Sequence, residues 1–401
     1  MRFIALLLIL CIQANLESQE KTTRPDFKTK PQVNWIFSTN YSVYASPLVT
    51  DSIVYIGGLD STLYSINLYS GIENWKFKSK GQIRSQVCAK GKYLYLNGGD
   101  GNLYCLDART GKKIWIFKTK GEKKYDFADY FNSSPVVFEN ILFFGSGDHN
   151  LYALNAQTGN KIWAFLTNGI VHSTPVIANQ KIFFGSFDGY VYALNLKNGT
   201  LAWKFKTVGH RYFPLGEVQG SPAAYDGKVF IGARDYNVYA LDQEKGFCHW
   251  NKAFKDGWGL CNTLNNGILY IGSADERKLI AVDPKSGSEF WNKKMEFLVF
   301  GNCAFSDSML YVGTTIGKLH GINLNTGEKI WSYETENYLQ NKQKYFKPDD
   351  SYRDDIYSII KSNEQFLEVE CELGGIFSTP AIVNGFIVFS STNGKIYCLE
   401  N

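Results

Sequence analysis

Residues 100–119 read DGNLYCLDARTGKKIWIFKT and predict a β-hairpin. Leu103 and Cys105 alternate along a first strand, and Trp115 and Phe117 alternate along a second, because successive side chains of a strand point to opposite faces. Gly111 stands between the two strands, where it can take the positive φ that a tight turn requires. The stretch is therefore expected to be one hairpin of an antiparallel sheet.

This hairpin recurs along the chain, with a turn residue about 15 positions before a tryptophan. The pairs are Asp60 and Trp75, Asp100 and Trp115, Asp148 and Trp163, Asp188 and Trp203, and Asp235 and Trp250, followed by Asp275 and Trp291 with one residue more and by a looser copy from Thr315 to Trp331. Each copy also has a glycine four residues before its tryptophan. A fixed period near 40 residues indicates a repeat architecture.

Each repeat holds four predicted strands, the first with a Ser/Thr-Pro step in most copies and the last with the tryptophan. Four antiparallel strands in about 40 residues make one propeller blade. Eight tryptophans share the register: Trp35, Trp75, Trp115, Trp163, Trp203, Trp250, Trp291 and Trp331. The last copy, residues 377–401, ends before its fourth strand, and the strand of Trp35 has no partner of its own. The sequence predicts an all-β chain, a single eight-bladed β-propeller of four-stranded antiparallel blades, closed by pairing of the N-terminal strand with the C-terminal blade.

The first 32 residues precede the repeats. Residues 3–12 form an apolar run after Arg2, shorter than the roughly 20 residues that span a bilayer, and predict a signal peptide over residues 1–14. Cys11 leaves a lipid anchor open as an alternative, although Leu10 fits lipoprotein processing poorly. Residues 15–32 predict a polar tether and residues 33–401 the propeller. No transmembrane segment is expected. The chain is expected to be exported and to be periplasmic or associated with the outer membrane. Secretion is the alternative.

Charge and cysteine content exclude two further classes of protein. The formal net charge is +4 without a basic run, so nucleic acid is not an expected partner. The seven cysteines after residue 14 are odd in number and irregularly spaced, which favours buried small hydrophobic residues over a disulfide framework.

Three stretches lengthen the repeats: residues 121–130, 209–217 and 336–373. Each lies between the last strand of one blade and the first strand of the next, so all three are expected on one face of the disc. A short helix is predicted over residues 349–366, with Ile356, Ile359 and Ile360 on one stripe. Loops on rigid scaffolds often carry function, and these three are the expected docking surface.

The repeat resembles the pyrroloquinoline quinone (PQQ)-type, or quinoprotein-like, β-propeller family. Its A-x-D-x-x-T-G-x-x-x-W motif is approximated by residues 107–115, DARTGKKIW, and by residues 155–163, NAQTGNKIW. Within the family the likeness is closest to the non-enzymatic outer-membrane assembly lipoproteins called BamB. The resemblance implies that the eight tryptophans dock neighbouring blades and are structural. The same family contains the quinoprotein dehydrogenases, which are longer and typically hold a vicinal disulfide over the quinone. This chain has no Cys-Cys step.

One register position near the start of each first strand is expected to face the channel. It is occupied by Tyr44, Arg84, Asn132, His172, Gln219, Gly259, Phe300 and Phe377. Arg84, Asn132, His172, Gln219, Phe300 and Phe377 are the candidate binding residues. The register holds no carboxylate, although Asp129 and Glu217 flank it, and calcium prefers carboxylate ligands. His172 has no expected carboxylate partner and is interpreted as a hydrogen-bonding pore residue rather than a base.

The sequence predicts a non-enzymatic scaffold in the cell envelope that docks protein partners, with outer-membrane β-barrel assembly as the specific hypothesis. No cofactor, catalytic residue or metal site is expected. Two alternatives stay open: a dehydrogenase that uses PQQ and Ca²⁺, and a sensor that binds a small ligand or glycan at the channel mouth.

Overall fold

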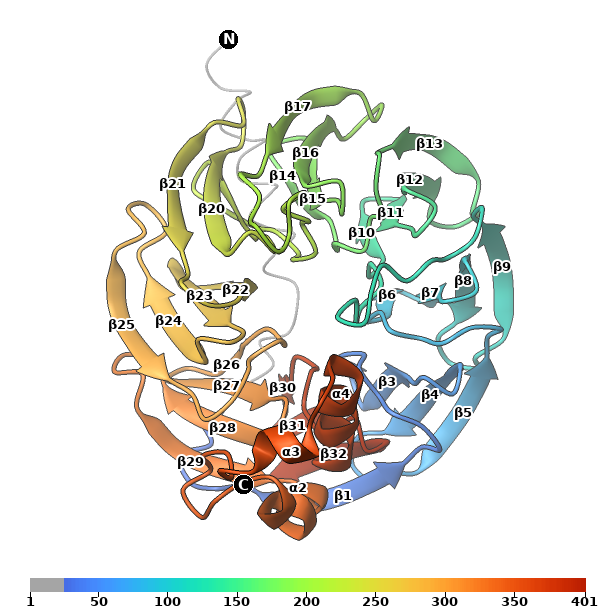
Figure 1. Ribbon diagram of the computed structural model, residues 1–401. Coiled ribbons are helices and arrows are strands. Elements are labelled where there is room, and N and C mark those ends of the chain that lie inside the picture. The colour runs from blue at the N-terminus through green and yellow to red at the C-terminus, as the bar shows by residue number, and fades with distance from the viewer. Residues whose placement is uncertain (1–24) are drawn as a thin grey trace.

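The repeated hairpins form the outer strands of eight antiparallel sheets arranged as a ring (Figure 1). The structure is a computed structural model and describes residues 25–401, without the side chains of Leu260, Cys261 and Asn363. The predicted signal peptide and the first part of the predicted tether lie outside the described residues.

The first four blades follow one another along the chain. Blade 1 holds β2 (Leu48–Thr50), β3 (Ile53–Gly57), β4 (Thr62–Asn67) and β5 (Glu73–Lys78), and blade 2 holds β6 (Cys88–Lys90), β7 (Tyr93–Gly98), β8 (Asn102–Asp107) and β9 (Lys113–Lys118). Blade 3 holds β10 (Val136–Phe138), β11 (Ile141–Gly145), β12 (Asn150–Asn155) and β13 (Lys161–Leu166), and blade 4 holds β14 (Val176–Ala178), β15 (Lys181–Gly185), β16 (Tyr190–Asn195) and β17 (Leu201–Lys206).

The remaining blades complete the ring. Blade 5 holds β18 (Ala223–Tyr225), β19 (Lys228–Gly232), β20 (Asn237–Asp242) and β21 (Cys248–Ala253), and blade 6 holds β22 (Gly259–Asn265), β23 (Ile268–Ser273), β24 (Lys278–Val282) and β25 (Glu289–Lys294). Blade 7 holds β26 (Ala304–Phe305), β27 (Met309–Thr314), β28 (Lys318–Asn323) and β29 (Lys329–Glu334), and blade 8 holds β30 (Ala381–Val383), β31 (Phe386–Ser390), β32 (Lys395–Glu400) and β1 (Gln32–Ser38).

Ring closure follows the predicted pairing. β1 lies antiparallel to β32, with Trp35 opposite Cys398. The N-terminal strand thus supplies the outer strand that the last copy lacks, and the prediction of an eight-bladed propeller closed in this way is confirmed.

The tryptophans pack against the glycine of the next blade's turn. A Cβ atom on Gly111 would lie 2.4 Å from the Trp75 ring, and one on Gly246 would lie 2.5 Å from the Trp203 ring. Both glycines have positive φ, so a side chain there meets both a clash and an unfavourable backbone conformation. The indole Nε1 of Trp203 donates to the Gln243 carbonyl at 3.0 Å. These contacts fit the docking role that the family resemblance implied.

The N-terminal segment replaces the missing turn of blade 8. Trp331 of blade 7 donates from Nε1 to the Phe27 carbonyl at 2.6 Å, where five of the other tryptophans use a carbonyl of the next blade's turn. Phe27 is fully buried beside Tyr311, and Asp26 accepts from Ser306 Oγ at 2.7 Å. The described end of the predicted tether is therefore docked on the ring.

The Ser/Thr-Pro steps link neighbouring blades near the axis. The backbone N–H of Ser134 donates to Thr174 Oγ1 at 2.9 Å, and that of Thr174 donates to Ser221 Oγ at 3.0 Å. The backbone N–H of Thr379 donates in the same way to Ser46 Oγ at 2.9 Å. Each hydroxyl satisfies a donor that the short first strand would otherwise leave unpaired.

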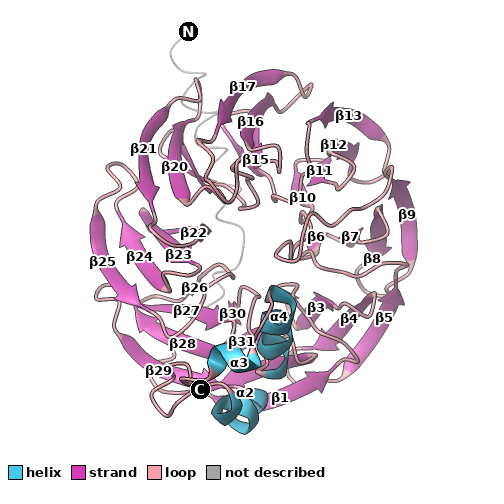
Figure 2. Ribbon diagram, in the orientation of Figure 1, coloured by secondary structure: helices cyan, strands magenta, loops and turns pink. Residues whose placement is uncertain are grey.

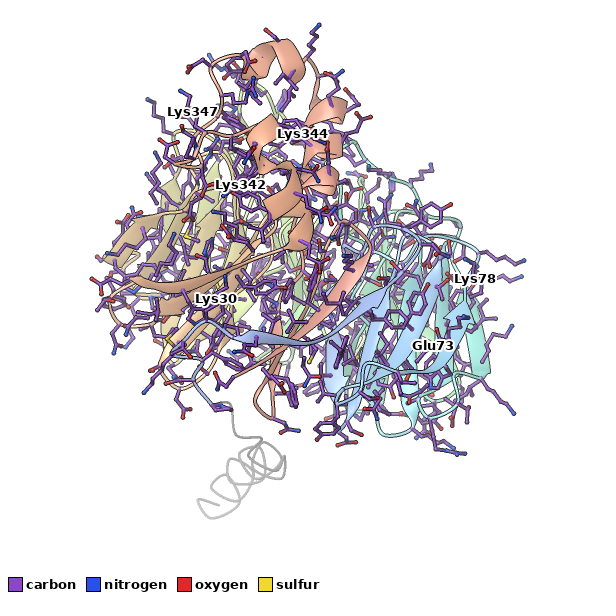
Figure 3. All side chains as sticks on the ribbon, turned by 90° about the horizontal axis from the view of Figure 1, so that it is seen from below. Lys30, Glu73, Lys78, Lys342, Lys344 and Lys347 are labelled. Carbon is purple, nitrogen blue, oxygen red and sulfur yellow. The ribbon has the colours of Figure 1, made fainter. Side chains whose placement is uncertain are left out.

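The long insertion differs from its prediction. It forms α2 (Glu336–Asn341), the 3₁₀ turn η1 (Lys342–Lys344), α3 (Ile356–Ile359) and α4 (Asn363–Glu372), so the single helix predicted over residues 349–366 is wrong. Thr335 and Ser362 each cap a helix with a side-chain oxygen, which starts α2 and α4 separately. Figure 2 shows these helices over blade 8, and Figure 3 shows that they project from one face of the disc.

The extra residue in the sixth copy also has a structural cause. The turn acid of blade 6 is Glu276, whose carboxylate accepts from the backbone N–H of Asp256 at 3.2 Å, and not Asp275. Counted from Glu276, the spacing to Trp291 is the same as in the other copies.

Candidate functional site

The predicted channel residues come together on the axis. Arg84, Asn132, His172, Gln219, Phe300 and Phe377 all line one cavity of about 320 Å³. Tyr44 lies beside this group, with its ring 5.0 Å from that of Phe377. Gly259 does not line the cavity and instead begins β22.

Residues 126–130, here called the axial plug, cross the channel at the face that carries the insertions. Arg84 Nη1 donates to the Asp129 carbonyl at 3.2 Å, and Gln219 Nε2 donates to the Ala128 carbonyl at 3.0 Å. The Tyr130 ring lies 4.8 Å from that of Phe377. Further contacts of the plug involve Tyr44, His172, Arg234 and Phe300. The plug therefore touches six of the eight blades and closes the axis with the chain's own residues.

His172 holds the plug through two carboxylates. Its Nδ1 lies 2.9 Å from an Asp129 carboxylate oxygen, and its Nε2 lies 2.6 Å from Glu122 Oε1. Burial alone would lower the pKa of His172, but hydrogen bonds to Asp129 and Glu122 raise it to about 9. The expectation that His172 lacks a carboxylate partner is wrong, because the insertion folds back over the ring and delivers both acids.

Arg234 anchors the other end of the plug. It is fully buried, and its guanidinium pairs with the Asp126 carboxylate, with Nη2 at 3.1 Å from Oδ1. Its Nε donates to Gln219 Oε1 at 3.0 Å. The Trp258 ring lies 4.6 Å from the guanidinium carbon, which adds a cation–π contact. Trp258, outside the tryptophan register, thus belongs to the channel mouth.

Glu370 of α4 is a buried acid under the helical insertion. Neither of its carboxylate oxygens has a hydrogen-bond partner among the described residues, and the residue is only 2% exposed. Burial raises the pKa of Glu370 to about 8. The group therefore titrates near neutral pH in the folded protein.

Glu370→Met is expected to stabilise the folded protein at pH 8.5 and to have little effect at pH 5. A raised folded-state pKa means that stability is lost as pH rises from the unfolded value near 4.5 towards 8. Methionine cannot ionise and so removes that loss, which is on the order of 4 kcal/mol because a change of one in pKa corresponds to about 1.4 kcal/mol. Urea unfolding at both pH values measures the difference. Glu368→Met, on the exposed side of α4, is the matched control and should show no such pH dependence.

The residues at the axis do not fit a quinone–calcium site. The space at the channel mouth is filled by the axial plug, whose Ala128 and Tyr130 are buried. The two acids that flank the register are engaged, Asp129 with His172 at 2.9 Å and Glu217 with the Tyr125 hydroxyl at 2.8 Å. Among the described residues no group of three His, Cys, Asp or Glu side chains could hold a metal ion.

Sequence reasoning missed Glu122, Tyr130, Arg234 and Glu370. Arg234 could have been found from the sequence. It stands one position before the turn acid of its blade, and the same position in other blades is occupied by Phe187, Gly147 and Gly99. A buried cation among apolar and glycine positions indicates a buried partner. The other three residues lie in insertions that have no counterpart in other blades. Alignment of the repeats therefore could not predict their positions.

The comparisons with known proteins agree on fold and family. The family model described as outer membrane protein assembly factor BamB matches residues 28–129, 99–256 and 188–343. No curated protein matches the sequence. No helix among residues 25–401 is long and apolar enough to cross a membrane.

Solved structures of different function share the fold. BamB from Moraxella catarrhalis is similar at 15% identity with a TM-score of 0.66, covering 93% of this chain and 98% of that one. The computationally designed Ika8 protein is similar at 13% identity and 0.70, covering 93% and 100%. The quinohemoprotein alcohol dehydrogenase from Comamonas testosteroni is similar at 14% identity and 0.68, covering 92% and 76%. Such likeness concerns the ring of blades alone.

Proposed function

The chain belongs to the family of the outer membrane protein assembly factor BamB, and from this premise we propose that it is a non-enzymatic scaffold that docks protein partners in the cell envelope. The observation that carries the proposal is the axial plug. Because residues 126–130 fill the channel mouth, the insertion-bearing face offers a closed surface to a partner.

The same face exposes large side chains that a partner would bury. Tyr357 is 86% exposed and Ile359 is 38% exposed on α3, and Tyr212 is 63% exposed on the second insertion. Tyrosine is enriched at the energetic centres of protein interfaces, and exposed large apolar side chains on one face favour a binding surface there. We propose that the partner belongs to the machinery that assembles outer-membrane β-barrels, as the family description suggests.

Photo-crosslinking in the native cell tests this function. A crosslinking amino acid at position 357 is expected to capture a component of β-barrel assembly. Leu339 is 52% exposed on α2, and Leu339→Ala with Ile359→Ala is expected to lower the yield at least tenfold. The probe at Tyr225, an exposed residue in the first turn of blade 5, is the control on the opposite face. Equal capture from both positions, or none at 357, would contradict the proposal.

The axial cavity supports a second candidate, a sensor for a small polar ligand. Its volume of about 320 Å³ is within the range of small-molecule sites, and Arg84 and Gln219 line it. Ligand-dependent stabilisation would support this function. Stoichiometric retention of PQQ with Ca²⁺ would instead favour a dehydrogenase.

A further inference from the structure

Positive and negative charges are unevenly distributed along the chain, although its net charge is small. Residues 76–124 contain thirteen Lys and Arg but only three Asp and Glu, a net charge of +10, whereas the whole chain carries +4. The remaining residues therefore carry −6. Eleven of the thirteen cations are lysines.

Six of these lysines lie along the outer edge of blades 1 and 2. Figure 1 shows β5 and β9 in succession on the circumference of the ring. The basic flank is defined by two lysines of β5, two of β9 and the lysines that follow each strand: Lys76, Lys78, Lys80, Lys113, Lys118 and Lys120. All six are exposed, and Figure 3 shows Lys78 at the rim of the disc.

The basic flank is almost free of ion pairs. Lys76 lies 3.4 Å from Glu73, and no ion pair joins the other five lysines to a described residue. Two more acids lie at the turns beside the flank: the Asp100 carboxylate accepts from the backbone N–H of Lys80 at 3.3 Å, and the Asp148 carboxylate accepts from that of Lys120 at 3.0 Å. The six lysines outnumber these three acids, so the flank keeps a net positive charge that faces solvent.

We propose that the basic flank is a docking surface for an anionic phospholipid bilayer. Isolated lysines on a convex rim suit mobile headgroups, which can move to meet them, and each lysine near an anionic membrane adds to the attraction. Ile114 is 43% exposed and Ile116 is 36% exposed between the lysines of β9, so apolar side chains face the same surface.

Two other anionic partners fit this surface less well. Single-stranded nucleic acid needs aromatic faces on which bases stack, and the exposed side chains between the β9 lysines are isoleucines. An acidic protein partner needs a surface of fixed, complementary shape. None of the six flank lysines lines a described cavity that could supply such a shape. Lipid headgroups in a fluid bilayer require neither aromatic side chains nor a surface of fixed shape.

Vesicle sedimentation tests the proposal on the full chain. Vesicles with 30% phosphatidylglycerol in phosphatidylcholine are expected to bind the protein at low salt and to release it at 0.5 M NaCl, because salt screens exposed charges. Neutral phosphatidylcholine vesicles give the baseline, since the apolar run at residues 3–12 is present in every variant. Lys80→Gln, Lys118→Gln and Lys120→Gln together are expected to weaken binding about a hundredfold.

A matched variant separates the flank from net charge. Lys161→Gln, Lys197→Gln and Lys294→Gln remove the same charge from exposed positions on other blades and are expected to leave binding within about threefold of wild type. Equal losses in the two triple variants, or binding independent of phosphatidylglycerol, would overturn the proposal. Tighter binding to a single-stranded oligonucleotide at equal salt would replace the lipid by nucleic acid.

The test is independent of the proposed partner docking. Leu339→Ala with Ile359→Ala is expected to lower partner crosslinking at least tenfold but to leave vesicle binding unchanged. The lysine triple variant should be folded like the wild type, with the same urea midpoint, because its side chains make no hydrogen bond or ion pair with a described residue.

Discussion

Trp203→Ala is expected to lower the free energy of unfolding by about 3–5 kcal/mol, the usual cost of removing a buried aromatic side chain. Trp203 is only 8% exposed and packs against Gly246 of blade 5. Gly246 has no side chain that could move into the space that the indole leaves. The Gln243 carbonyl also loses its donor. Urea unfolding at pH 7, followed by tryptophan fluorescence and circular dichroism, measures the loss.

Trp75→Ala is the matched control. Trp75 stands at the same register position in blade 1, but it is only half-buried, and its Nε1 has no hydrogen-bond partner among the described residues. Its replacement should therefore cost clearly less than that of Trp203. A loss below about 1 kcal/mol for Trp203→Ala, or equal losses at the two positions, would contradict the blade-docking role, since burial and the indole hydrogen bond are what distinguish them.

The ring itself was predictable because its information is local and repeated. Each blade places its tryptophan and its turn glycine at the same spacing, so eight copies confirm one another. The closing strand was predictable for the same reason, since the last copy lacked what Trp35 supplied. The docking of Phe27 was not, because a single phenylalanine among polar residues carries no periodic signal.

The channel ring was also predictable, but the plug was not. Counting along the repeats brought Arg84, His172 and Gln219 to one cavity, as the structure has them. The plug depends on contacts between residues 43 (His172 and Asp129) to 247 positions (377 − 130) apart, made by an insertion that occurs once. Propensity and register say nothing about where such a loop folds. The signal that remained was the buried cation Arg234, which requires a carboxylate partner.

His172→Ala is expected to cost about 3–5 kcal/mol, because removing one partner of a buried ion pair leaves the other charges uncompensated. Glu122 and Asp129 are 7% and 0% exposed at their side chains and face the same imidazole. Without His172 the two acids would repel each other under the plug. Urea unfolding at pH 7 measures the loss, and proteolysis near residues 121–130 should show whether the plug is released.

The stability of the wild type should also fall at alkaline pH. The pKa of His172 is raised to about 9 in the folded protein, above the unfolded value near 6.5. Its contribution is therefore complete below pH 6.5 and is lost as pH rises through about 9. The loss is on the order of 3 kcal/mol. Unfolding between pH 6 and pH 9.5 measures it, in the Glu370→Met background so that the second buried group does not titrate over the same range.

A second substitution distinguishes lost charge balance from lost packing. Adding Glu122→Gln to His172→Ala should recover part of the stability, because one of the two uncompensated carboxylates is then neutral. If His172 only filled space, the added substitution would bring a further loss. In the Glu370→Met background the alkaline fall should disappear in either variant. If the alkaline loss of stability persisted without His172, another group would be responsible for the titration. The proposal that His172 holds the plug over the channel would then be wrong.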